Sequence, residues 1–216
     1  MSARDRILGA IRESLGSTPR DTAAIAAEAA ALLADPDAIR PELAGPSLTE
    51  SFAAKAWGLG TTLDTVADMA EVPAAVSRYL AQYGLGPGLA MQQAPELTGL
   101  DWSALAPHDT VAPDEPVALG LARHGIAESG SLVIHSAPDN PILLGFLPLH
   151  HILVLERRRM LPHLEDYAAL LGREDGIPRN AILITGPSGT TDIEGSYVRG
   201  AHGPGFLHVI LVGDEE

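Results

Sequence analysis

Five short, uninterrupted runs of apolar residues in the second half of the chain are the feature that most limits its possible folds. Turn-forming residues separate these runs, which cover residues 117–122, 131–135, 152–155, 181–185 and 208–212. Runs of this length without polar alternation predict strands that are buried on both faces. Helical periodicity over residues 160–171 adds a helix between two of the runs, so the pattern predicts an α/β layered domain with a largely parallel or mixed sheet.

The first half of the chain predicts helices and only short strands. Helices are expected over residues 3–15 and 21–34, and prolines and glycines then interrupt the chain between residues 36 and 46. Residues 1–46 are therefore predicted to form an N-terminal helical arm, which can fold back on its own domain or clasp a partner. The α/β domain is predicted to occupy residues 47–216. Its first part should contain helices at 49–57 and 72–83, strands at 61–65 and 89–91, and an irregular segment at 93–116.

The charge of the chain argues against nucleic acid as a partner. Fourteen basic side chains stand against 28 acidic ones, which gives a net charge of −14, and such a surface repels phosphate backbones. Arg157, Arg158 and Arg159 form a local basic cluster, which we interpret as a solvated turn. No apolar run of about 20 residues is present and charges interrupt the N-terminal segment, so we expect a cytoplasmic protein without a signal peptide or membrane span.

The chain has no cysteine, which excludes disulfides, thiol nucleophiles and thiolate-bound metals or iron–sulfur clusters in this chain. His150 and His151 are adjacent and precede an expected strand, where neighbouring side chains point to opposite faces. They are therefore poor joint metal ligands. We expect no metal site and no cofactor bound by this chain.

Two polar segments, residues 123–130 and 185–194, are expected where strands end. Ligands in open α/β sheets bind beyond the carboxyl ends of the strands. Glycines there let a backbone approach a ligand closely, and hydroxyl groups can donate to an anion. The residues expected to contact a ligand are Gly125, Ser129, Thr185, Gly186, Ser188, Thr190, Glu194 and Gly203.

The second segment and the residues after it combine hydroxyl, carboxylate and imidazole groups. Asp192 and His202 are candidate catalytic residues, because a carboxylate near a histidine can orient the ring or exchange protons with it. Ser188 and Thr190 can offer donors to an anion. The alternative is that these two residues only cap a helix that begins near Thr191.

Glu128 is the third candidate catalytic residue. It follows an apolar pair and precedes Ser129 and Gly130 at the junction of two expected strands. A carboxylate in this place can act as a nucleophile or base. It can equally accept hydrogen bonds from loop N–H groups and serve the structure alone.

Several of these segments, in this order, resemble the LUD domain of lactate-utilisation proteins. The resemblance is carried by Gly-Ile-Ala-Glu-Ser-Gly-Ser at 125–131, Thr-Gly-Pro-Ser at 185–188, Asp-Ile-Glu at 192–194, Gly-Ala-His-Gly-Pro at 200–204 and Leu-His-Val-Ile-Leu at 207–211. It is clear over roughly residues 117–212. The chain length and the missing cysteines are similar to C-type members rather than to the larger, cysteine-bearing B-type. Gly189 departs from the family, which often carries a basic residue there.

The resemblance implies a Rossmann-like layered sandwich similar to that of sugar-phosphate isomerases and CoA transferases. It also implies a non-redox subunit or accessory protein of an iron–sulfur system that oxidises L-lactate to pyruvate. In that reading the A- and B-type proteins are partners that hold the iron–sulfur clusters, and this chain binds a small organic anion. The alternative is a stand-alone enzyme acting on a small carboxylate, phosphosugar or acyl-CoA, with Glu128 as the acyl acceptor.

Overall fold

The computed structural model describes residues 2–16, 21–35, 40–173, 178–192 and 195–214. The chain divides into two compact units, Met1–Pro41 and Glu42–Glu216. The first unit contains helices α1 (Ala3–Leu15) and α2 (Thr22–Ala34), where the sequence predicts them. Ser2 caps α1, because its hydroxyl accepts a hydrogen bond from the Asp5 N–H while the Asp5 carboxylate accepts one from the Ser2 N–H.

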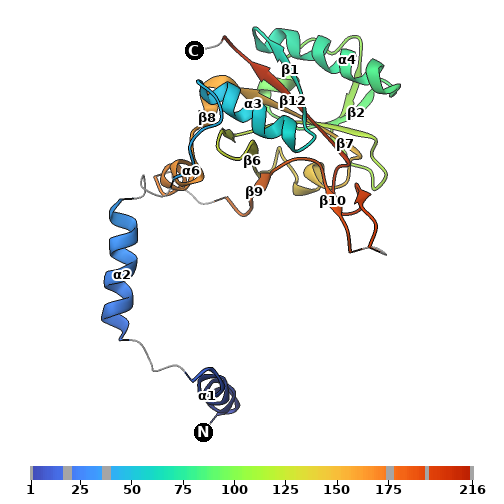
Figure 1. The fold of residues 1–216 in the computed structure, drawn as a ribbon. Helices are drawn as coiled ribbons and strands as arrows, with labels where there is room; N and C mark the ends of the chain where they lie inside the picture. Colours follow the sequence, from blue (N-terminus) through green and yellow to red (C-terminus); the bar gives the residue numbers. More distant parts are fainter. Residues whose placement is uncertain (1, 17–20, 36–39, 174–177, 193–194, 215–216) are drawn as a thin grey trace. The chain divides into compact units, whose positions relative to one another are not determined.

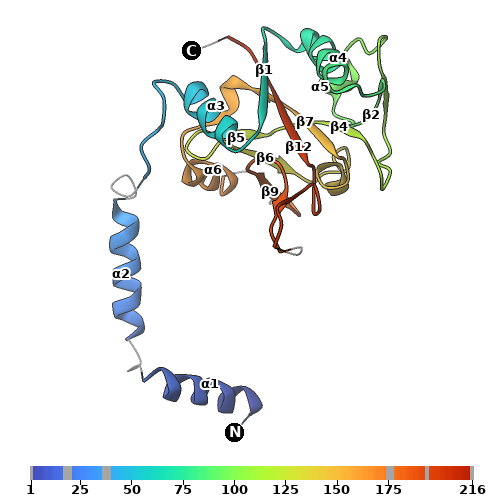
Figure 2. The ribbon, with the colours of Figure 1, turned by 45° about the vertical axis from the view of Figure 1, so that its right-hand side comes forward.

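A sheet of six strands, all parallel, forms the centre of the second unit (Figures 1 and 2). The strand order is β1-β12-β7-β4-β2-β3. The strands are β1 (Thr62–Val66), β2 (Gly88–Met91), β3 (Ala106–His108), β4 (Val117–Leu121), β7 (His150–Glu156) and β12 (Phe206–Val212). Nearly every residue of β4, β7 and β12 is buried. The prediction of a parallel sheet with doubly buried central strands is therefore confirmed for these three strands.

Helices cover one face of this central sheet. α4 (Val72–Tyr83) and the short α5 (Pro95–Thr98) pack there, and β3 and α5 occupy the segment that was expected to be irregular. Val76, Leu80 and Leu97 from the helices share one apolar cluster with Leu119 and Ile152 from the strands. The opposite face carries α3 (Leu48–Gly58) and a second, smaller sheet, whose side chains form another apolar cluster with β7 and β12.

This second sheet, of order β8-β5-β6-β9, is not predicted by the sequence. It contains β5 (His124–Ile126), β6 (Ser131–His135), β8 (Met160–Leu161) and β9 (Ala181–Ile184), and α6 (Leu164–Leu171) packs on it through Tyr167. The predicted helix over 160–171 is wrong at its start, because Met160 and Leu161 pair with β5. The prediction that this strand is buried on both faces is wrong for β9, in which Ala181 and Leu183 are exposed.

The remaining elements are short. They are the 3₁₀ helices η2 (Met69–Glu71), η3 (Ile142–Gly145) and η4 (Arg157–Arg159) and the hairpin strands β10 (Gly189–Thr190) and β11 (Val198–Arg199). Within the described residues, no helix is long and apolar enough to cross a bilayer.

Two histidines in the central sheet are buried as neutral rings. Burial lowers the pKa of both His151 and His208 to about 4, from an ordinary value of 6.5. The Nδ1 atom of His208 lies 2.8 Å from the Thr62 hydroxyl, and its Nε2 atom has no hydrogen-bond partner. Such rings resist protonation in the folded state more than in the unfolded state.

We therefore expect stability to fall as pH drops from 6.5 to 4. In this window the unfolded chain protonates these histidines and the folded chain does not, at ~1.4 kcal/mol per pKa unit and thus about 3 kcal/mol per histidine. Urea unfolding across the window measures this loss. His151→Leu should lose visibly less stability than the unmodified protein, and an identical loss in both would rule out His151 as a cause.

Candidate functional site

The described residues between 185 and 205, which leave out 193 and 194, form a hairpin of β10 and β11. β10 and β11 pair in antiparallel fashion. Two further backbone hydrogen bonds join the ends of this segment. The Ser188 N–H donates to the Pro204 carbonyl at 2.8 Å, and the Gly200 N–H donates to the Ser188 carbonyl at 2.9 Å. The described residues around Thr191 are not helical, so the interpretation of Ser188 and Thr190 as helix caps is wrong.

This segment borders a small cavity of about 220 Å³, which we name the signature pocket. Five predicted ligand or catalytic residues line it together, namely Thr185, Gly186, Ser188, His202 and Gly203. The rest of its wall is mostly apolar and consists of Gly145, Phe146, His151, Ile182, Leu183, Ile184, Pro204 and Leu207. The structure thus brings together residues that the sequence places in two separate motifs.

The signature pocket lies at the amino ends of central strands. His151 is near the start of β7, and Leu207 is near the start of β12. The preceding strand, β9, belongs to the small sheet, and residues 185–205 lead into the amino end of β12. The segment thus follows the carboxyl end of a strand, as expected, but this strand belongs to the small sheet and not to the central one.

His151 is the most buried polar side chain of the signature pocket, and sequence analysis does not select it. It is 1% exposed, and its Nδ1 atom has no hydrogen-bond partner. Because its pKa is lowered by burial, the ring is neutral at pH 7 and carries one N–H donor and one acceptor nitrogen. His150 turns the other way, with its Nδ1 2.8 Å from the Tyr79 hydroxyl, as strand alternation predicts. Buried polar atoms without a partner are uncommon in folded proteins, which sets His151 apart from the other residues that line this pocket.

A row of hydroxyl groups joins the upstream motif to the signature pocket. The Ser129 and Ser131 oxygens lie 2.7 Å apart, and the Ser131 and Thr185 oxygens also lie 2.7 Å apart. Ser131 is buried, while Thr185 lines the pocket. Ser129 thus reaches the pocket only through this row and does not line it.

Gly125 and Glu128 lie outside the signature pocket. Gly125 is packed so closely that a Cβ atom there would lie 2.6 Å from side-chain atoms of Leu155 and Met160. The Glu128 Oε1 atom accepts a hydrogen bond of 2.7 Å from the Leu164 N–H, at the first residue of α6. This hydrogen bond favours the interpretation of Glu128 as an acceptor of backbone N–H groups over its interpretation as a nucleophile or base.

Thr190 and Asp192 pair with each other in the hairpin. The Thr190 hydroxyl donates to the Asp192 carboxylate, and this bond, more than the nearby charge of His202, lowers the pKa of Asp192. Neither residue lines the signature pocket. Gly189 faces the phenol ring of Tyr197, into which any side chain at position 189 would run. Glu194 lies outside the described residues.

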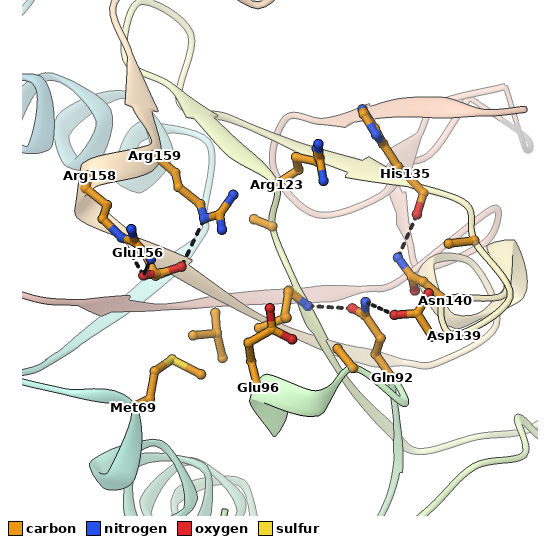
Figure 3. Close-up of a pocket in the computed structure, with 15 residues that line it drawn as sticks. Met69, Gln92, Glu96, Arg123, His135, Asp139, Asn140, Glu156, Arg158 and Arg159 are labelled. Carbon is orange, nitrogen blue, oxygen red and sulfur yellow. Dashed lines mark hydrogen bonds and ion pairs between the residues drawn. The ribbon is translucent and has the colours of Figure 1, made fainter. Parts of the chain in front are cut away.

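Sequence analysis missed a second cavity, which we name the carboxyl-end pocket (Figure 3). It lies where β2, β4 and β7 end, and Gln92, Arg123 and Glu156 line it there. Arg158 and Arg159 line it as well. Arg158 is exposed and Arg159 half-buried, as expected for a solvated turn, but that interpretation is wrong for Arg157, which is buried. The sequence signal that could have revealed this pocket is the cluster of arginines directly after a buried strand.

No group of three or more histidine and acidic side chains that could hold a metal ion occurs among the residues that the structure describes. The site is therefore defined by its hydroxyl and imidazole groups.

The parallel central sheet with helices on one face and a helix and small sheet on the other defines an α/β protein of the Rossmann-like layered class. The chain belongs to the LUD domain family, whose model matches residues 50–212. A crystal structure of a DUF162 family protein from Deinococcus radiodurans is similar, with a TM-score of 0.57 and 18% identity over 77% of this chain and 96% of that one. That likeness bears on the fold alone.

Curated relatives match over part of their length. An uncharacterised protein from Neisseria meningitidis is 36% identical over 94 residues, which are 42% of this chain and 40% of that protein. The lactate utilization protein C of Anoxybacillus flavithermus is 30% identical over 115 residues, or 52% of each chain. The chain thus spans about half the length of these relatives.

Removal of the Glu128 carboxylate should destabilise α6. We expect Glu128→Ala to lower the free energy of unfolding by about 1 kcal/mol and Glu128→Gln by less, because the amide oxygen can still accept the Leu164 N–H. Urea unfolding measures both, with Glu165→Gln in the same turn of α6 as the charge control. Equal stability of Glu128→Ala and the unmodified protein would contradict the structural role.

Proposed function

We propose that this protein is a non-redox subunit or accessory protein of an L-lactate-oxidising iron–sulfur system and binds a small organic anion in the signature pocket. Membership of the LUD family and the name of relatives such as the Anoxybacillus flavithermus protein support the role in lactate utilisation. Because the chain has no cysteine, thiolate-bound clusters must come from partners. We propose that these partners are the A- and B-type lactate-utilisation proteins.

The observation that carries the anion proposal is the grouping of Ser188, His202 and the buried His151 at the wall of one small, mostly apolar cavity. Ser188 and His202 line the same cavity, so one hydroxyl and two imidazoles can donate to a single carboxylate. Ligand sites commonly combine an apolar wall with a few polar groups that fix orientation.

The size and lining of the signature pocket favour a small monocarboxylate. Ile182 and Ile184 offer an apolar surface to a methyl group, and the cavity of about 220 Å³ accommodates a molecule of the size of lactate or pyruvate. A stand-alone transferase with Glu128 as acyl acceptor has less support, since the Glu128 carboxylate bonds to α6 and lies outside this pocket.

Binding of L-lactate and pyruvate by the full chain tests the anion site. Isothermal titration calorimetry should show saturable binding of at least one of them. Ser188→Ala and His151→Leu should each weaken it about tenfold, the value of one hydrogen bond to a charged group. His151→Leu should keep or raise stability at pH 7, because it removes a buried polar group without a partner.

Ser103→Ala, at an exposed serine outside the signature pocket, is the control for that experiment and should bind as the unmodified protein does. Absence of binding for both anions, or undiminished affinity in both pocket variants, would exclude the signature pocket as their site.

Affinity purification tests the proposed partners. The tagged full-length chain, expressed in its native cell during growth on L-lactate, should co-purify with cysteine-rich proteins that contain iron and acid-labile sulfide. The purified assembly should reduce an artificial electron acceptor with L-lactate, and this chain alone should not. Recovery of the chain without iron-containing partners would contradict the proposal.

A further inference from the structure

The carboxyl-end pocket occupies the point of the central sheet where α/β proteins form ligand sites. After β2 the chain continues to β3 on one side, and after β4 the next strand of this sheet is β7 on the other. Adjacent parallel strands that continue in opposite directions leave a crevice beyond their carboxyl ends. Gln92 directly follows β2, and Arg123 lies two residues after the end of β4. The cavity has a volume of about 430 Å³, nearly twice that of the signature pocket, which suits a small molecule.

One side of the carboxyl-end pocket is basic. The Nε atoms of Arg158 and Arg159 donate to the Glu156 carboxylate at 2.7 and 2.9 Å. Burial opposes ionisation of Glu156, but the hydrogen bonds and charges of these arginines outweigh it and lower its pKa. Glu156 therefore stays ionised and offsets one of the two arginine charges, and Arg123 adds a third guanidinium to the lining.

This cluster contrasts with the chain as a whole, whose net charge is −14. Guanidinium groups present paired N–H donors that match the oxygens of a carboxylate or phosphate. Across the whole pocket the three arginines are matched by Glu96, Asp139 and Glu156, so the pocket is polarised and its arginine side is the one that attracts an anion.

The other side of the pocket presents hydrogen-bond acceptors. In Figure 3 the guanidinium groups of Arg123 and Arg159 lie toward one side, whereas the carboxylates of Glu96 and Asp139 lie toward the other. Buried Gln92 fixes that side, since its Oε1 accepts the Leu121 N–H at 2.9 Å and its Nε2 lies 3.4 Å from Asp139 Oδ2. Carboxylates accept hydrogen bonds from hydroxyl groups and repel a second anionic group.

We propose that the carboxyl-end pocket is a second ligand site, which binds a small organic anion that also carries hydroxyl groups. The anionic group, a carboxylate or a phosphate, lies against Arg123 and Arg159. The hydroxyl groups donate to Glu96 and Asp139. This site is separate from the signature pocket, which lies at the opposite end of β7, and it does not depend on the function proposed above.

Calorimetry on the full chain tests this proposal with glycerate, glycerol 3-phosphate and succinate as probes. At least one of the two hydroxylated anions should bind saturably, and the one that binds identifies the anionic group as a carboxylate or a phosphate. Succinate should bind at least about tenfold more weakly, because its second carboxylate meets Glu96 and Asp139. Arg123→Gln and Arg159→Gln should each weaken the hydroxylated probe about tenfold.

Arg78→Gln is the matched charge control, because Arg78 is an exposed arginine that pairs with Asp64 outside this pocket. It should bind the hydroxylated probe as the unmodified protein does. If Arg123→Gln does not fold, Arg159→Gln decides. Failure of both hydroxylated probes to bind, equal binding of succinate, or unchanged affinity in a folded Arg159→Gln would overturn the proposal.

Discussion

The burial of β7 on both faces is the constraint on which the rest of this structure depends. His150–Glu156 pairs with β4 along one edge and with β12 along the other, and six of its seven residues are buried. A strand in this position has no free backbone or surface along its length, so polar chemistry is confined to its two ends. His151 near the first end and Glu156 at the second are about 17 Å apart at ~3.3 Å per residue. Each lies on the wall of one of the two cavities.

The sequence predicts the parts of the fold in which local pattern and burial agree. The helix at Val72–Tyr83 follows from its periodicity, and the central strands β4, β7 and β12 follow from their uninterrupted apolar runs. The small sheet does not follow, because its membership depends on pairings between distant segments. Met160 and Leu161 continue an apolar helical pattern, yet they pair with Gly125 and Ile126. No local preference distinguishes such an edge strand from the first turn of a helix.

The site shows the same division. Ser188, His202 and Gly203 lie in two short motifs of one segment, and the hydrogen bonds of Ser188 with Pro204 and Gly200 bring them together as expected. His151 belongs to no motif and is recognisable only once its side of the sheet is known. The carboxyl-end pocket assembles Gln92, Arg123 and Arg159 from three separate strand ends, and only the strand order makes them neighbours.

The row of hydroxyls at Ser129, Ser131 and Thr185 has a directional property. Each hydroxyl carries a single proton, so Ser131 can donate along only one of its two bonds, although it can accept along both. An acceptor placed at Thr185 takes the Thr185 proton, so Ser131 donates to Thr185 and Ser129 donates to Ser131. A donor placed there instead leaves the Thr185 proton free for Ser131. The polarity of the Gly125–Ser131 motif is therefore tied to the chemical character of whatever occupies the cavity, without movement of any heavy atom.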